Sequence, residues 1–147
     1  MLKPADVRIR PVTLDDVAAL VPLCEQLGYR STAQQVDARL RRVVDSRSHA
    51  VFAAEVDGRI AGWIHVHESL TVESDPYAEI GGLVVDAAAR CKGVGRALVE
   101  EARVWARRSG FQSVVVRSNV VRPEAHPFYE QLGFRRTKTT HVYTRDP

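Results

Sequence analysis

The sequence predicts an α/β fold that forms a single domain over residues 1–147. Strand-like alternation and helix-like periodicity follow one another along the chain, with no linker, repeat or low-complexity segment between them. Over residues 77–117, a strand, a glycine loop, a helix and a further strand form a βαβ-like crossover. A chain of 147 residues has the length of one domain and can bury roughly 70% of its unfolded surface.

The composition excludes several protein classes. Apolar residues make up 45% and charged residues 27% of the chain, as in ordinary globular proteins. Apolar runs such as residues 17–21 fall far short of the roughly 18 residues that span a bilayer, and the first dozen residues lack the apolar core of a signal peptide. Cys24 and Cys91 cannot build a disulfide framework or a CxxC metal site. We therefore expect a cytoplasmic protein with no membrane partner.

The first third of the chain predicts one strand and two helices. Residues 7–10 alternate between apolar and basic side chains, which is typical of a short strand. A helix should then run from the capping pair Thr13 and Asp16 to the stop signal Gly28. A second helix should begin at Ser31 or Thr32, because apolar residues recur at helical spacing after this point.

Strand patterns dominate the middle of the chain. They cover residues 50–56, 59–68 and 77–85. The pair Asp57-Gly58 between the first two predicts a tight hairpin. The adjacent Gly81 and Gly82 in the third predict a β-bulge or the close approach of a ligand.

The last third predicts a helix, a strand, a helix and a strand. They cover residues 93–110, 112–117, 123–132 and 134–143. The first helix opens at Gly93-Val94-Gly95, where flexible backbone, unpaired N–H groups and the helix dipole would suit a phosphate. Leu98 replaces the third glycine of a dinucleotide fingerprint, and Arg96-Ala97 replaces the Gly-Lys-Ser/Thr of a P-loop. The alternative is a glycine pair that only shapes a turn.

The net charge of +3 is distributed unevenly. Residues 1–89 carry 9 Lys and Arg against 13 Asp and Glu, whereas residues 90–147 carry 12 against 5. This asymmetry indicates that the second part meets an anion. The basic residues do not form runs with interleaved aromatics, so we expect no nucleic-acid partner.

The motifs resemble the GCN5-related N-acetyltransferase (GNAT) superfamily. Arg90-x-x-Gly93-x-Gly95 fits the acetyl-CoA motif Gln/Arg-x-x-Gly-x-Gly/Ala of that family, at the same strand-to-helix junction. Asp57-Gly58, Asn119 and the run 125–134 follow in the order and spacing of the family. The resemblance covers essentially the whole chain. It implies an N-acetyltransferase domain with a mixed central sheet of about six or seven strands, flanked by four helices and splayed at the acetyl-CoA site.

The resemblance also implies acetyl-CoA, or coenzyme A, as co-substrate. The backbone N–H groups of the glycine loop would hold the pyrophosphate, and the strand over residues 83–85 would bind the pantetheine arm. The expected cofactor-binding residues are Leu83, Val84, Val85, Arg90, Cys91, Lys92, Gly93, Val94, Gly95, Arg96, Asn119 and Tyr129.

Acetyl transfer to an amine needs a proton acceptor, a polarised carbonyl and a proton donor for the leaving thiolate. The resemblance implies Glu79 as the base, because histone acetyltransferases of the superfamily carry their catalytic glutamate at this distance before the loop. The backbone N–H of Leu83 would polarise the carbonyl. Tyr129 would protonate the thiolate.

Each role has an alternative. Glu79 could orient substrate or serve structure, Tyr129 could be a packing aromatic, and Asn119 could cap a strand end. Cys91 could carry an acetyl intermediate, but no histidine lies near it in sequence, so we expect direct transfer in a ternary complex.

Trp63, His65 and His67 share one face of a strand, and we expect them to line the acceptor site with Tyr77 and Glu79. A half-buried sheet face is the alternative. No complete ligand set accompanies the histidines, so we expect no metal.

Residues 68–79 contain Glu or Asp at four positions and no Lys or Arg, which would attract a cation. The acidic stretch therefore predicts a cationic acceptor. The run from residue 118 is similar to aminoalkylphosphonate and aminoglycoside 6′-N-acetyltransferases, which implies a small primary amine. The alternatives are a protein or peptide amine, and a non-catalytic acetyl-CoA-binding regulatory domain. Dimers are common in the family, so a homodimer is an expectation that the sequence leaves open.

Overall fold

The fold is taken from a computed structural model that describes residues 6–147. Contacts within the chain divide it into two compact units, one ending at Arg117 and the other covering Ser118–Pro147. Whether the whole chain acts as one domain stays a prediction.

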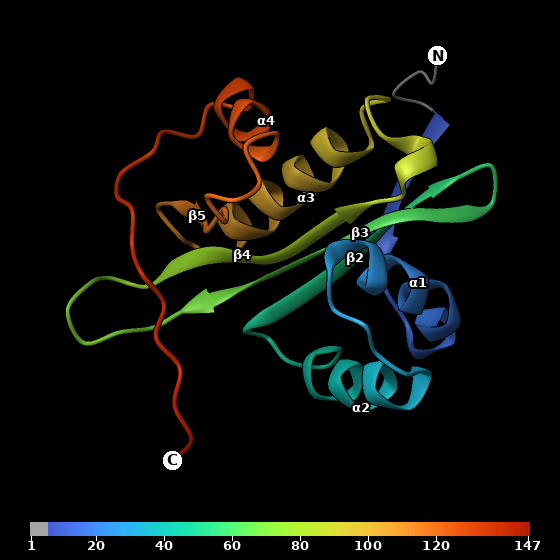
Figure 1. Ribbon diagram of the computed structural model, residues 1–147, viewed down its shortest axis with the longest axis horizontal. Helices are drawn as coiled ribbons and strands as arrows, with labels where there is room; N and C mark the ends of the chain where they lie inside the picture. The colour runs from blue at the N-terminus through green and yellow to red at the C-terminus, as the bar shows by residue number, and fades with distance from the viewer. Residues whose placement is uncertain (1–5) are drawn as a thin grey trace. The chain divides into compact units, whose positions relative to one another are not determined.

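The first unit holds a five-stranded mixed sheet and three α-helices (Figure 1). Its elements are β1 (Val7–Pro11), α1 (Val17–Leu27), α2 (Ala33–Val43), β2 (His49–Val56), β3 (Arg59–Ser69), β4 (Tyr77–Val85), α3 (Val94–Arg108) and β5 (Val114–Val116), with 3-10 turns at Leu14–Asp16 and Ala87–Ala89. The strand order is β1-β2-β3-β4-β5, antiparallel up to β4 and parallel between β4 and β5.

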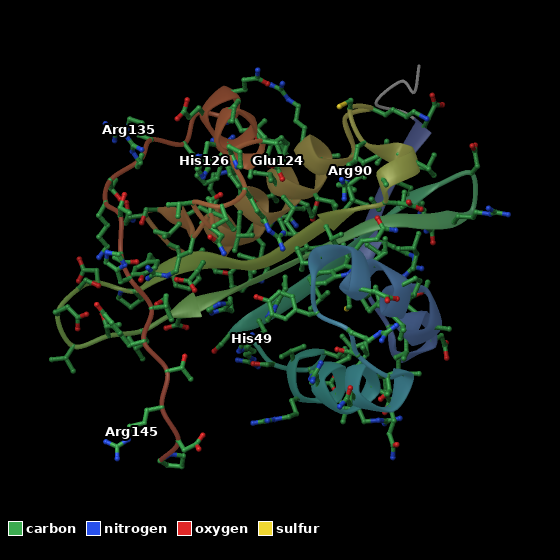
Figure 2. The ribbon with its side chains drawn as sticks, in the orientation of Figure 1. His49, Arg90, Glu124, His126, Arg135 and Arg145 are labelled. Atoms are coloured by element: carbon green, nitrogen blue, oxygen red, sulfur yellow. The ribbon has the colours of Figure 1, made fainter. Side chains whose placement is uncertain are left out.

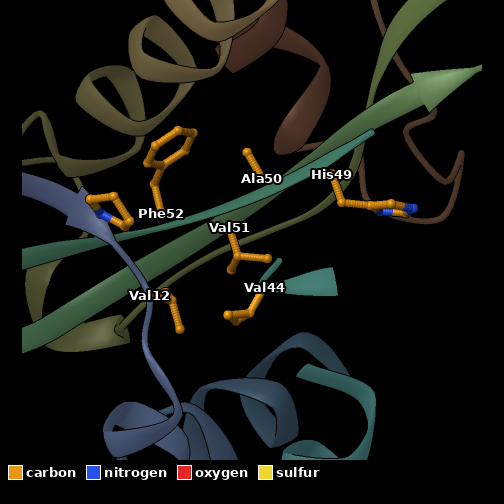
Figure 3. A pocket seen from close by; sticks show the side chains of 7 residues that line it. Val12, Val44, His49, Ala50, Val51 and Phe52 are labelled. Atoms are coloured by element: carbon orange, nitrogen blue, oxygen red, sulfur yellow. The ribbon is translucent and has the colours of Figure 1, made fainter. Parts of the chain in front are cut away.

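Helices cover both faces of the sheet. The alternation of side chains along the strands sends Val51 and Ala53 of β2 toward α1 and α2, where they join the apolar cluster around Leu20 and Leu40. Figure 3 shows Val51 on one side of β2 and Phe52 on the other. α3 packs on that second face, so the sheet is the middle of three layers in this unit.

The predicted capping pairs are present, although Thr13 and Asp16 cap the 3-10 turn Leu14–Asp16 that leads into α1, and α1 itself begins at Val17. The backbone N–H of Thr13 donates to Asp16 Oδ2 at 2.8 Å, and Thr32, rather than Ser31, exchanges hydrogen bonds with Gln35 at 3.0 and 3.1 Å. Gly28 ends α1 with a φ of 102°, in the left-handed region that glycine adopts without strain.

The predicted hairpin and bulge are also confirmed. Asp57 and Gly58, with φ of 51° and 74°, join β2 to β3. Between β3 and β4, His65 lies opposite Gly82 whereas Val66 lies opposite Ile80. Gly81 is therefore the extra residue of a bulge.

The predicted splay of the sheet is present at the same point. β5 pairs with β4 only through residues 78–80 of β4. From Gly81 to Val85, β4 continues with β3 on one side and no strand of the described chain on the other. The bulge and the end of β5 pairing coincide, so one edge of β4 is unpaired from the two glycines onward.

The second unit contains α4 (Ala125–Gln131). The strand predicted over residues 134–143 is wrong, and the sheet of the described chain has five strands instead of six or seven. Val142 and Tyr143 are about nine-tenths exposed (89% and 90%), and a strand forms only where its backbone finds a pairing partner. The residue types of this segment do not by themselves supply such a partner.

No helix among residues 6–147 combines the length and the apolar character needed to cross a membrane.

Candidate active site

The glycine loop forms the N-terminus of α3. Gly93 is the N-cap with a φ of 84°, and no side chain caps this end. The helical hydrogen bonds begin with the N–H of Ala97, which donates to Gly93 O at 3.1 Å. The N–H groups of Val94, Gly95 and Arg96 precede that bond, so they face out of the helix end toward any bound anion.

Two cations fold back onto the connection before this loop. Arg90 donates from Nε to the carbonyl of Val85 at 3.1 Å, and Lys92 donates from Nζ to the carbonyl of Ala88 at 3.2 Å. Figure 2 shows Arg90 beside the segment that leads into α3. Cys91 is exposed and has a φ of 62°, so it turns the backbone of the loop.

The open edge of β4 presents backbone groups that no strand uses. The N–H of Asp86 donates to Ala61 of β3 at 2.7 Å, so its direction is toward β3. Backbone groups alternate in direction along a strand, and those of Val84 point the same way while those of Leu83 and Val85 point to the open side. The bond from Arg90 to the carbonyl of Val85 agrees with this direction.

A polar cluster lies on β4 and β5 just before the bulge. Arg117 donates from Nε to Glu79 Oε1 at 3.0 Å and from Nη2 to the Tyr77 hydroxyl at 3.4 Å. The second oxygen of Glu79 lies 3.6 Å from His67 Nε2. The bond to Glu79 raises the pKa of Arg117 above its usual value, so the guanidinium stays charged. Glu79 is largely shielded, with 18% of its side chain exposed.

Three histidines stack beside this cluster. His49 Nδ1 and His65 Nε2 lie 2.9 Å apart, and the ring centroids of His49, His65 and His67 are separated by 5.1 to 5.4 Å. Burial, helped by the two neighbouring imidazoles, lowers the pKa of His65 to about 4. Burial and His67 lower the pKa of His49 as well. The centre of the stack is therefore neutral at physiological pH.

A cavity of about 410 Å³ lies between the sheet and helices α1 and α2. The strands contribute Val51, Trp63, His65, Gly81 and Gly82, and the helices with their connection contribute Leu20, Cys24, Leu27, Tyr29, Ser31, Val36, Arg39, Leu40 and Val43. The wall is mostly apolar. Its floor includes both glycines of the bulge, so the cavity reaches the place where the edge of β4 opens.

The glycines leave room for ring systems on β3. A Cβ on Gly82 would come within 2.9 Å of the Trp63 ring, and a Cβ on Gly81 would lie 3.2 Å from the His67 ring. The Trp63 indole N–H is buried and has no hydrogen-bond partner among the described residues. The absence of side chains at Gly81 and Gly82 thus allows the rings of Trp63 and His67 to pack directly against the backbone of β4.

The predicted acceptor residues fall into two neighbouring groups. Trp63 and His65 line the cavity, whereas His67, Tyr77 and Glu79 belong to the polar cluster. The contact between the rings of His65 and His67 joins the groups. All five lie on the first unit.

Sequence reasoning missed Arg117, His49 and Arg39. Arg117 could have been found from register, because it follows Val115, the β5 partner of Glu79, by two positions on the same face. His49 lies opposite His67 in the hairpin that Asp57-Gly58 predicts.

Tyr129 and Asn119 belong to the second unit. The Tyr129 ring contacts Phe128 and Phe134, with centroids 5.1 and 5.8 Å away. Burial raises the pKa of its hydroxyl, against an opposing effect of Arg122, so the phenol is protonated at neutral pH. Asn119 Oδ1 accepts from the N–H of Val121 at 3.1 Å and orders the local turn.

Over residues 6–147, no three His, Cys, Asp or Glu side chains form a group that could hold a metal ion.

Comparisons with known proteins agree with this arrangement. Residues 15–134 match the family model described as "Acetyltransferase (GNAT) family". An aminoglycoside N(6′)-acetyltransferase type 1 of Stenotrophomonas maltophilia is 31% identical over 144 residues, which cover 95% of this chain and 92% of that relative. The uncharacterized N-acetyltransferase YhdJ of Bacillus subtilis is 27% identical over 121 residues, 82% and 85% of the two chains.

A solved aminoglycoside N-acetyltransferase, AAC(6′)-Iy in complex with CoA, has a TM-score of 0.85 to this chain. The match covers 95% of this chain and 94% of that one. At 19% identity, the likeness shows a shared fold.

Proposed function

Because the chain belongs to the acetyltransferase (GNAT) family, an acyltransferase family whose co-substrate is acetyl-CoA, we propose that it acetylates the primary amine of a small molecule by direct transfer in a ternary complex. One observation carries this proposal. The acceptor-sized cavity reaches β4 at Gly81 and Gly82, where the strand loses its β5 partner and exposes backbone groups. An amine in the cavity and an acyl group at the open edge would therefore meet.

The residues present fit acetyl-CoA. Its pyrophosphate would lie against the N–H groups of Val94, Gly95 and Arg96, and its pantetheine arm along residues 83–85 of β4. When bound, acetyl-CoA supplies an activated acetyl thioester. Asn119, which orders its own turn, is proposed to contact the arm through its remaining amide N–H groups.

The backbone N–H of Leu83 is proposed to donate to the acyl oxygen. Its direction toward the open side of β4 supports this role, because the donor is fixed in place by the β3 pairing of the residues on either side. A preorganised donor of this kind stabilises the charge that develops on the oxygen during attack.

Glu79 is proposed to accept the amine proton. Arg117 occupies Oε1, so Oε2, on the His67 side, is the oxygen available to receive it. An alkylammonium is almost fully protonated at neutral pH, so the reaction requires such an acceptor, directly or through water.

Tyr129 is proposed to protonate the departing thiolate. The phenol carries its proton at neutral pH, as a donor must, because the ordinary tyrosine pKa is already near 10 and burial raises it further. Direct transfer is preferred to an acetyl-Cys91 intermediate, because Cys91 is exposed and no histidine contact activates it within the described chain.

A cavity of about 410 Å³ between two helices and a sheet has a size that suits a small molecule. The aminoglycoside acetyltransferase relative also supports a small amine. A cytoplasmic location and a homodimer remain predictions.

Thiol release from acetyl-CoA, measured with a panel of amines and peptides, tests the proposal. We expect release that depends on a small amine. Tight CoA binding without turnover on any amine would instead support the non-catalytic regulatory alternative. A thermal shift with CoA measures that binding, since a ligand at about 100 times Kd adds roughly 2.7 kcal/mol of stability, and no shift would overturn both readings.

A further inference from the structure

The cavity between α1, α2 and the sheet has an unusual charge pattern for an enzyme that would act on polycations. None of the described residues that line it is Asp or Glu, and Arg39 is its one Arg or Lys. The carboxylates that the sequence places near the acceptor lie elsewhere. Glu79, for example, is held in the polar cluster by Arg117.

Arg39 is free to bind a ligand anion. Its Nη1 donates to Ser31 Oγ at 2.8 Å, and both residues line the cavity. Within the described part of the chain, no carboxylate lies at ion-pair distance from Arg39, whereas Arg41 on the same helix pairs with Asp37 at 2.7 Å. A guanidinium has five donors in a planar fork that matches a carboxylate, so most of its donors remain available.

The rest of the wall suits an apolar body. Leu20, Leu40 and Val51 pack around the indole of Trp63, and His65 is held neutral by its burial. A cavity of about 410 Å³ lies within the range of small-ligand pockets, roughly 300 to 1,000 Å³.

We propose that the acceptor is an amine with an apolar body and a carboxylate, which lies in this cavity with its body against Trp63, its carboxylate on Arg39 and its amine at Gly81 and Gly82. The inference rests on the proposed acetyltransferase function and narrows its substrate class to amino-carboxylates. A polycationic amine such as an aminoglycoside would instead place ammonium groups beside Arg39 with no carboxylate in the wall to pair with them. The sequence predicted a cationic acceptor from residues 68–79. The proposal changes this to an acceptor that carries one ammonium group and one carboxylate.

Matched acceptor pairs test this inference. Phenylalanine is compared with phenylalaninamide, and 4-(aminomethyl)benzoate with 4-(aminomethyl)benzamide, alongside kanamycin and spermidine. We expect the carboxylate of at least one pair to exceed its amide in kcat/KM by roughly tenfold or more, because charge-assisted hydrogen bonds are about twice as strong as neutral ones. Both polycations should be poorer acceptors than that carboxylate.

The variant Arg39→Gln should remove the preference for the carboxylate, so that the ratio of kcat/KM between the carboxylate and its amide falls to about one. Arg42→Gln is the matched control, because Arg42 lies on the same helix but outside the cavity wall. A preference for kanamycin or spermidine, or an equal loss for carboxylate and amide in Arg39→Gln, would overturn the inference and leave the acetyltransferase function standing.

A binding measurement separates the two proposals. With CoA present, the carboxylates should raise the thermal midpoint of the wild type and not that of Arg39→Gln. If this shift occurs but no amine is ever acetylated, the cavity binds amino-carboxylates at Arg39, but the proposed function fails and the acceptor role fails with it. If carboxylates neither bind nor react while other amines are acetylated, the inference fails alone.

Discussion

Arg117 Nε lies 3.0 Å from Glu79 Oε1, and this bond joins the residue that follows β5 to β4 close to the point where the two strands part. The bond fixes one oxygen of the carboxylate and leaves the other on the side of His67. The base proposed for the reaction is thus oriented by a neighbouring strand.

Glu79→Gln should lower kcat by roughly 10² or more, because the amide cannot accept the amine proton. The KM for acetyl-CoA should change little, since the glycine loop lies elsewhere. Steady-state kinetics over a range of pH provides the measurement. Glu73→Gln, an exposed carboxylate from the same acidic stretch, is the control. Unchanged kcat across that range would remove Glu79 as the base.

Gly93→Ala and Gly110→Ala form a matched pair at the two ends of α3. Both glycines have positive φ, 84° and 85°, and a Cβ on either would meet no atom within 4 Å. Each substitution should cost about 1 to 2 kcal/mol of stability through backbone strain.

Only Gly93→Ala should also weaken CoA binding, on the order of tenfold, because its methyl group lies at the proposed pyrophosphate site. Calorimetric titration with CoA makes the comparison. Equal CoA affinity in the two variants would show that the glycine loop only shapes a turn and does not bind CoA.

Gly82→Ala should impair acceptor use, because the new methyl group would lie 2.9 Å from the Trp63 ring and displace it into the cavity. We expect a higher KM for the amine and an unchanged KM for acetyl-CoA. Adding Trp63→Phe removes the two ring atoms in the clash, so the double variant should regain part of the lost affinity. A double variant no better than Gly82→Ala would show that the contact with Trp63 is not the cause.

The unfolding free energy should fall as the pH drops from about 6.5 toward 4. In the native state the pKa of His65 is lowered to about 4, whereas in the unfolded chain it returns to about 6.5. Between these values the unfolded state binds the extra proton, so acid favours unfolding, by at most ~3 kcal/mol from this group. The lowered pKa of His49 acts in the same direction.

Urea unfolding at several pH values measures this effect. His65→Leu should flatten the dependence in that interval, and His141→Leu, at an exposed position, should leave it as in the wild type. The same slope in His65→Leu as in the wild type would contradict the assignment.

Local patterns predicted most of the first unit. The caps at Thr13 and Thr32 and the hairpin at Asp57-Gly58 depend on neighbouring residues, and each was confirmed. The bulge at Gly81 was also predicted, because adjacent glycines weaken a regular ladder. The strand predicted over residues 134–143 is wrong, because a strand needs a pairing partner and none forms for this segment within the described chain.

The site was predictable only in part, for a related physical reason. Glu79 and the glycine loop could be recognised from motifs along the chain. Arg39 could not, because it joins the site through helix packing. Arg117 is not part of any motif and could be found only from the register between β4 and β5, which pairs residues distant in sequence.

Direct transfer from acetyl-CoA to an amine is the central claim, and quantifying free thiol and acetylated amine together tests it most directly. With acetyl-CoA alone, the protein should release no burst of thiol. With an accepted amine, one acetylated amine should form for each thiol released. A thiol burst equal to the amount of protein and lost in Cys91→Ser, or no acetylated amine with any acceptor, would contradict the account.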